Sequence, residues 1–135
     1  MIKFLFAISS LSISCNNTMD SNQIKQVVIH YVSRDIETFY DVTCANFEDF
    51  FGNKYRTKKI TEKNQLIVFQ KIMNNHQNSS FKNIDVRAKI YIYCYNKKVS
   101  VLCVDKFGNI ELDNKLMGKN DKLFNFLEKN CEDFK

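Results

Sequence analysis

The side chains of this chain that are best suited to chemistry belong to five cysteines and two histidines. Cysteine supplies a thiolate nucleophile, a metal ligand or half of a disulfide, and histidine supplies a base or a metal ligand. His30 lies in a β-branched segment and His76 in a polar tract, and neither stands at an HExxH, HxH or CxxC spacing. The sequence therefore predicts no metal site and no cofactor.

Other common active-site patterns are also missing from the sequence. It has no glycine-rich phosphate loop and no GxSxG motif, and its adjacent acids, such as Glu48 and Asp49, point apart on a helix. An enzyme would have to be a hydrolase that uses Cys44 or His30, with Cys44 near a strand end and His30 on the neighbouring strand. The sequence favours a non-enzymatic protein.

One cysteine, Cys15, ends a short apolar leader. The chain opens with the positive charge of Lys3, continues through an apolar run and reaches Cys15 after a Ser-Ile-Ser segment. This run is too short to span a bilayer, which takes about 20 apolar residues. The layout of a basic start, an apolar middle and a small-residue end predicts an export signal over residues 1–14.

The position of Cys15 directly after the leader resembles the lipobox of bacterial lipoproteins. In that class the cysteine is diacylated and becomes the mature N-terminus, and Ser14 fits the position before it. The resemblance implies a membrane-anchored envelope protein with a lipidated cysteine and polar tether over 15–23 and one domain over 24–135. Ser12-Ile13-Ser14 also satisfies the small-x-small rule of ordinary signal peptidases, so plain secretion is the alternative.

Composition limits the class of domain. The formal net charge of +5 is too small to argue for nucleic-acid binding, and one of the positive charges, Lys3, lies in the leader. Twelve phenylalanines and six tyrosines supply bulk for a core, while proline is absent and glycine occurs three times. We expect one domain with regular strands and helices rather than a loop-rich mini-protein.

Hydrophobic periodicity predicts the order β-β-α-β-β-β-α. This order indicates an α+β fold, an antiparallel sheet of about four to five strands with two helices packed on one face. A helical turn is also expected over 46–51, and the terminal helix is capped by Asn120 or Asp121. The predicted strands cover 27–32, 37–44, 87–95, 98–105 and 110–112, and the helices cover 62–75, capped by Thr61, and the segment after 121.

Four cysteines remain in the domain: Cys44, Cys94, Cys103 and Cys131. An even number in an exported domain predicts two disulfides, and the alternative is four reduced cysteines packed as small apolar side chains.

A two-residue turn at Asn96-Lys97 would set Cys94 opposite Val99 and Cys103 opposite Ile90 on one face of a hairpin. The two cysteines would then be about 13 Å apart along the ladder, whereas a disulfide needs α-carbons within about 7 Å. Each is therefore expected to bond to one of the other two cysteines, in an order that stays open.

Two surfaces are candidates for binding. The alternation in 87–95 places Tyr91, Tyr93 and Tyr95 with Lys89 on one sheet face, as an aromatic ladder for a protein or another stacking ligand. The alternative is that other elements cover this face, which Leu102 and Val104 are also predicted to share.

The second candidate surface is the basic run between Lys54 and Lys63, which could lie against anionic lipids. Its alternative is a solvated loop and helix start.

The sequence as a whole predicts a small, non-enzymatic envelope lipoprotein that binds another protein, like those used as inhibitors, immunity proteins or assembly accessories. A hydrolase that uses Cys44 or His30 is the alternative, and a lipid-facing protein is a third possibility. The sequence leaves the oligomeric state open.

Overall fold

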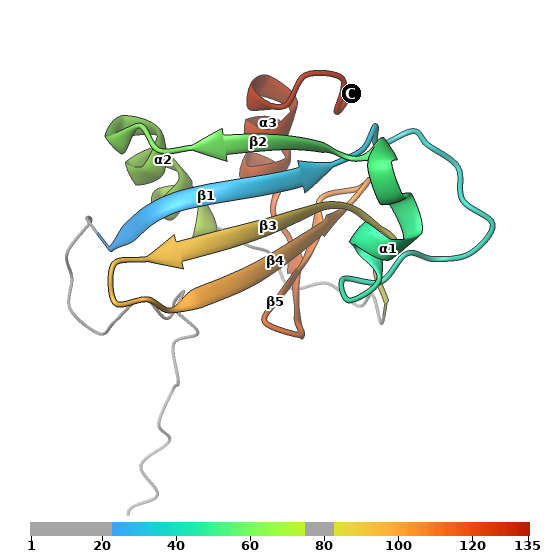
Figure 1. Cartoon of the computed structure of the whole chain (residues 1–135), viewed down its shortest axis with the longest axis horizontal. Coiled ribbons are helices and arrows are strands. Elements are labelled where there is room, and N and C mark those ends of the chain that lie inside the picture. Colours follow the sequence, from blue (N-terminus) through green and yellow to red (C-terminus); the bar gives the residue numbers. More distant parts are fainter. Residues whose placement is uncertain (1–22, 75–82) are drawn as a thin grey trace, which may run out of the picture.

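An antiparallel sheet is the frame of the computed structural model, which describes residues 23–74 and 83–135 (Figure 1). Within these residues the sheet has six strands in the order β2-β1-β3-β4-β5-β6. The strands are β1 (Ile24–Tyr31), β2 (Arg56–Ile60), β3 (Val86–Cys94), β4 (Val99–Asp105), β5 (Asn109–Leu112) and β6 (Lys115–Lys119).

Three α-helices and one short 3₁₀ turn cover the two faces of this sheet in the described part of the chain. In Figure 1, α1 lies on one side of the sheet, near one end of β3, and α2 and α3 lie on the other side. The side chain of Glu62, not of Thr61, caps α2, and Asn120 caps α3 by accepting a hydrogen bond from the Leu123 amide. The helices are α1 (Phe47–Phe51), η1 (Gly52–Lys54), α2 (Lys63–Met73) and α3 (Asp121–Asn130).

The larger core lies between the sheet and the pair α2 and α3, and we call this side the helix face. Alternate strand residues such as Ile29, Ile90 and Leu102 are fully buried there. They pack against apolar residues of both helices: Leu66, Phe69, Met73, Leu123, Phe126 and Leu127. The expected α+β class with an antiparallel sheet is confirmed. Apolar residues of α2 and α3 share one core with the sheet, and burial of such a stripe stabilises the fold.

The number and order of elements differ from the expectation. Residues 37–44 form no strand, and β2 takes the expected place beside β1. The strand β6, which pairs with β5, was not expected and brings the described sheet to six strands. β2 shows no apolar alternation because it is an edge strand whose sequence RTKKI buries Ile60 alone. Segment 37–44 is rich in β-branched and aromatic residues, but it meets β3 only locally. The Val42 carbonyl accepts a hydrogen bond from the Val86 amide, and the Val42 amide donates one to the Asp85 side chain.

The register between β3 and β4 also differs from the expected one. Tyr93 pairs with Val99, and the connection contains Lys97 at a positive φ of 69°, as in a three-residue loop that ends in a bulge. Relative to a two-residue turn, this loop shifts β4 by one residue and turns every β4 side chain to the other face. Leu102 and Val104 therefore point into the helix face, and Cys103 points to the opposite side.

One disulfide joins Cys44 to Cys103, with their α-carbons 5.7 Å apart, and Cys94 is also disulfide-bonded. The expected bond from Cys131 is wrong, because Cys131 is a free, buried cysteine. Cys131 lies close to Tyr31, at one end of β1. Cys94 pairs with Ile24, at the other end of the same strand. Tyr31 and Ile24 are about 24 Å apart along the strand, which is too far for a disulfide between Cys131 and Cys94. Cys103 faces the other side of the sheet, so Cys131 cannot bond to it either.

No helix among residues 23–74 and 83–135 combines the length and the apolar character needed to cross a membrane.

Thiol labelling tests this cysteine arrangement. In urea without reductant, iodoacetamide should label Cys131 and leave Cys44 and Cys103 unlabelled. In the native protein the labelling of Cys131 should be slow, because burial raises the pKa of its thiol to about 12. Peptide mapping by mass spectrometry gives the result, and label on Cys44 or Cys103 before reduction would contradict the pairing.

Candidate functional site

The side of the sheet opposite α2 and α3, which we call the loop face, is covered at one end by segment 32–55. A second buried cluster lies under this segment, made by Val32, Val42, Phe47, Phe51, Ile84, Val86 and Cys103. The Cys44–Cys103 disulfide ties the segment covalently to β4, just before α1 begins. A cross-link across 59 residues of sequence restricts the unfolded chain and contributes about 3–5 kcal/mol in the loop-entropy model.

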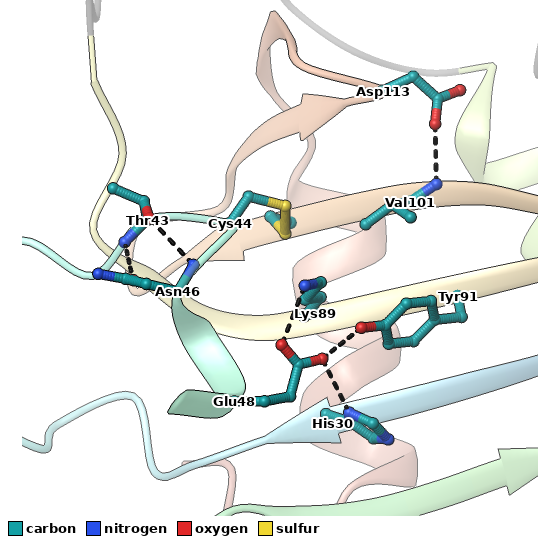
Figure 2. Close-up of a disulfide and its surroundings, with 10 residues drawn as sticks. His30, Thr43, Cys44, Asn46, Glu48, Lys89, Tyr91, Val101 and Asp113 are labelled. Atoms are coloured by element: carbon teal, nitrogen blue, oxygen red, sulfur yellow. Dashed lines mark hydrogen bonds and ion pairs between the residues drawn. A yellow bond between two sulfur atoms is a disulfide. The ribbon is translucent and has the colours of Figure 1, made fainter. Parts of the chain in front are cut away.

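The carboxylate of Glu48 on α1 is the centre of a polar cluster on the loop face (Figure 2). Its Oε2 accepts a hydrogen bond from Lys89 Nζ at 2.9 Å, and its Oε1 accepts one from the Tyr91 hydroxyl. His30 Nδ1 lies 3.2 Å from Oε1, and the His30 ring stacks on Tyr55 with centroids 4.7 Å apart. Groups from β1, β3 and α1 therefore meet at one carboxylate.

The electrostatics of the cluster keep Glu48 ionised. Partial burial acts to raise the pKa of Glu48, but the hydrogen bonds from Tyr91 and Lys89 outweigh it and hold the pKa below its usual value. Burial likewise acts to lower the pKa of Lys89, and its hydrogen bond with Glu48 outweighs this and raises it. Burial, reinforced by the bond to Glu48, raises the pKa of Tyr91. These shifts favour a fixed ion pair that fastens α1 to the sheet.

The structure does not bring together Cys44 and His30, the two residues expected to serve a hydrolase. The Cys44 sulfur is bonded to Cys103, so it is not a thiolate nucleophile in this structure. Cys44 borders a hollow of about 490 Å³, and His30 is absent from the described residues that line it. Glu48 contacts one nitrogen of His30 and could orient the imidazole. The hydroxyl in this cluster belongs to Tyr91, which donates to Glu48 and whose pKa is raised, so it is a poor nucleophile.

The predicted tyrosine ladder is divided by α1. Lys89 is buried and Tyr91 is half-buried because both donate hydrogen bonds to Glu48, so their polar ends face α1. Tyr93 is half-buried, and Tyr95 is exposed at the end of the hairpin. The binding role predicted for these four residues stays a prediction, and the open part of the ladder is Tyr93 with Tyr95.

The middle of the basic run between Lys54 and Lys63 forms the exposed edge of the sheet, while Lys54 ends η1 and Lys63 begins α2. Arg56, Lys58 and Lys59 belong to edge strand β2, and Arg56 forms an ion pair with Asp133 at 2.7 Å. Charged side chains on an edge strand discourage pairing with other chains, which gives these lysines a structural reason to be there.

Sequence reasoning missed the most exposed large apolar side chain among the described residues, which lies in the loop before α1. We call residues 33–41 the aromatic loop; in Figure 1 it extends away from the sheet between β1 and α1. Phe39 is fully exposed, and Tyr40 is 64% exposed with its ring edge-on to Phe50. The sequence signal was the pair Phe39-Tyr40 between acidic residues, which was interpreted as part of a strand.

Buried Arg87 holds the base of the aromatic loop. Its side chain is 2% exposed and makes two hydrogen bonds of 2.8 Å to the Asp85 carboxylate and one of 3.0 Å to the Ile36 carbonyl. Asp85 in turn accepts a hydrogen bond from the Val42 amide, at the other end of the loop. Arg87 and Asp85 thus fix the backbone on both sides of Phe39, at Ile36 and at Val42, while Phe39 stays in solvent.

In the part of the chain that the structure describes, no group of three or more histidine, cysteine or acidic residues is placed to hold a metal ion. His76 and the predicted lipidation site Cys15 lie outside the described residues.

Comparisons with known proteins give no relatives: no protein-family model, no curated protein and no solved structure matches this chain.

Replacement of Glu48 by Gln tests the role of the polar cluster. The change should lower the free energy of unfolding by about 1–3 kcal/mol at neutral pH, because Lys89 loses its charged partner. A carboxyl with a lowered folded pKa stabilises above its unfolded pKa, near 4.5, and loses that contribution as pH falls through the folded value. The difference between wild type and variant, measured by urea denaturation, should therefore shrink in acid.

The matched control is Asp49→Asn, which removes a negative charge from an exposed position of the same helix. Because the pKa of Lys89 is raised in the folded protein, Lys89 keeps its full contribution to stability at every pH below its usual pKa near 10.5. Titration of Lys89 therefore does not affect the measurement in acid. Equal losses in both variants, or a loss that persists unchanged in acid, would contradict this role of Glu48.

Proposed function

We propose that this protein is a small, exported binding module of the cell envelope, that it acts without catalysis, and that its partner is another protein. The observation that carries the proposal is the aromatic loop, which presents a fully exposed Phe39 from a base fixed by buried Arg87. An exposed aromatic side chain on a preorganised loop is typical of a binding hot spot, because little conformational entropy remains to be lost on association.

Two features support the exported location. The leader ending at Cys15 has the layout of a lipoprotein export signal. The Cys44–Cys103 disulfide is the kind of bond that persists in oxidising compartments outside the cytosol. A lipid on Cys15 would anchor the domain through the polar tether 15–23.

The hydrolase remains the alternative function, and one contact favours it. Glu48 lies 3.2 Å from His30 Nδ1 and could hold the imidazole as a base. We prefer the binding module because the candidate nucleophile of the hydrolase, Cys44, is held in a disulfide.

Intact mass of the exported protein from its native host tests the anchor. We expect a chain that begins at Cys15 with an acyl-glyceryl increment, and we expect Cys15→Ser to move the protein from the membrane to the soluble fraction. Cys131→Ala is the control, because its thiol has no part in the anchor. A cysteine sulfur cannot both carry the lipid and form a disulfide. Because Cys44 and Cys103 bond to each other and Cys131 is free, the disulfide of Cys94 competes directly with a lipid on Cys15. A peptide linking Cys15 to Cys94 would contradict the anchor and leave a secreted module.

Photo-crosslinking from the aromatic loop tests the binding function. Benzoylphenylalanine at position 39, in the exported protein in its native envelope, should give a discrete adduct with a protein. The same probe at Phe107, another exposed aromatic residue in the β4–β5 turn, is the control and should not give that adduct. Absence of any protein adduct, with turnover of an ester or peptide that is lost in His30→Gln, would favour the hydrolase instead.

A further inference from the structure

An apolar groove lies on the outer side of the helix pair, between α2 and α3. It has a volume of about 360 Å³, and its apolar walls come from Val68 and Ile72 on α2 and Phe126 on α3. Val68 is 48% exposed, so its side chain is accessible to an occupant of the groove. A hydrogen bond of 3.2 Å from Gln65 to Asn130 holds the two helices together at this groove.

The rim of the groove is basic. Lys122 and Lys129 of α3 line it, both exposed, and among the described lining residues no side chain is acidic. The nearby carboxylate of Glu128 is taken up by Arg34, whose Nη1 lies 2.7 Å away. An occupant that suits this groove therefore has an apolar or aromatic tip and a negative surround.

The aromatic loop has this chemistry. Phe39 and Tyr40 form its apolar tip, and exposed Asp35, Glu37 and Asp41 surround the tip. Its one positive side chain, Arg34, is paired with Glu128 and lies 3.9 Å from Asp35. The acidic surround opposes insertion into anionic lipid headgroups, which favours a protein surface as the partner.

We propose that the aromatic loop of one chain inserts into the lysine-rimmed groove between α2 and α3 of a second copy. The inference rests on the proposed function, because both take the loop as a protein-binding element. The base of the loop contacts α3, where Arg34 pairs with Glu128, but in Figure 1 the loop extends away from α2, and Phe39 is fully exposed. A chain therefore does not fill its own groove.

The contact is heterologous, since different surfaces of the two copies meet, and repetition produces a ring or an open chain rather than a closed pair. A single loop in one groove is a small interface and belongs to the weak class. An envelope anchor would strengthen such contacts by confining many copies to one surface.

Sedimentation velocity of the exported, purified protein over a concentration range that reaches about 1 mM tests the proposal. Wild type should form concentration-dependent oligomers that weaken with added salt, because the charges are complementary. Phe39→Ser, at the loop tip, and Val68→Asp, in the groove, should each weaken association by about thirty-fold or more. Both positions are exposed, so both variants should keep the wild-type thermal unfolding, and Phe107→Ser is the matched control that should still associate.

Mixing the two variants gives the decisive result. Phe39→Ser retains an intact groove and Val68→Asp retains an intact loop, so an equimolar mixture should form a dimer that cannot grow further. A wild type that stays monomeric throughout, or a mixture that stays monomeric while wild type associates, would overturn the proposal. A monomeric wild type whose position 39 crosslinks to a different envelope protein would overturn self-association alone, and the absence of both self-association and protein adducts would also overturn the binding function.

Discussion

The register between β3 and β4 is the constraint on which the rest of the structure depends. The bulged connection at Lys97 places Leu102 and Val104 in the core beneath α2 and α3 and turns Cys103 to the loop face. A shift by one residue would bury Cys103 on the helix face and break its reach to Cys44. One backbone position in a hairpin therefore decides both the composition of the main core and whether the Cys44–Cys103 disulfide can fasten segment 32–55.

On the loop face, specific bonds hold segment 32–55 against the sheet, and the apolar core beneath it is small. The helix α1 is too short to be stable alone, and it is held by the disulfide, by a small apolar cluster and by the ion pair of Glu48 with Lys89. Partial burial of a charged lysine and a charged glutamate costs free energy unless the two form an ion pair. The pair of Glu48 with Lys89 therefore fixes the position of α1 on the sheet. The same logic applies to Arg87, whose buried guanidinium needs both Asp85 and the Ile36 carbonyl.

These fixed points explain why an apolar side chain remains outside. Burial of Phe39 would be favourable, but Arg87 and Asp85 hold the backbone on both sides of it, at Ile36 and at Val42, so that the tip of the aromatic loop extends from the fold. The groove between α2 and α3 leaves a second apolar surface open, with positive charge around it. The acidic aromatic loop and the lysine-rimmed groove are both attached to the same sheet, so they can bind a partner with little change in the backbone.

The sequence alone determined what depends on local periodicity and composition. The alternation of 87–95 and the stripe Leu66, Phe69, Met73 predicted β3 and α2, because each pattern repeats at the period of its own element. The tertiary structure alone decided the edge strand β2, the face of Cys103, the isolation of Cys131 and the meeting of His30, Glu48, Lys89 and Tyr91. These depend on register and on contacts between segments distant in sequence, and no local pattern of residues encodes either one.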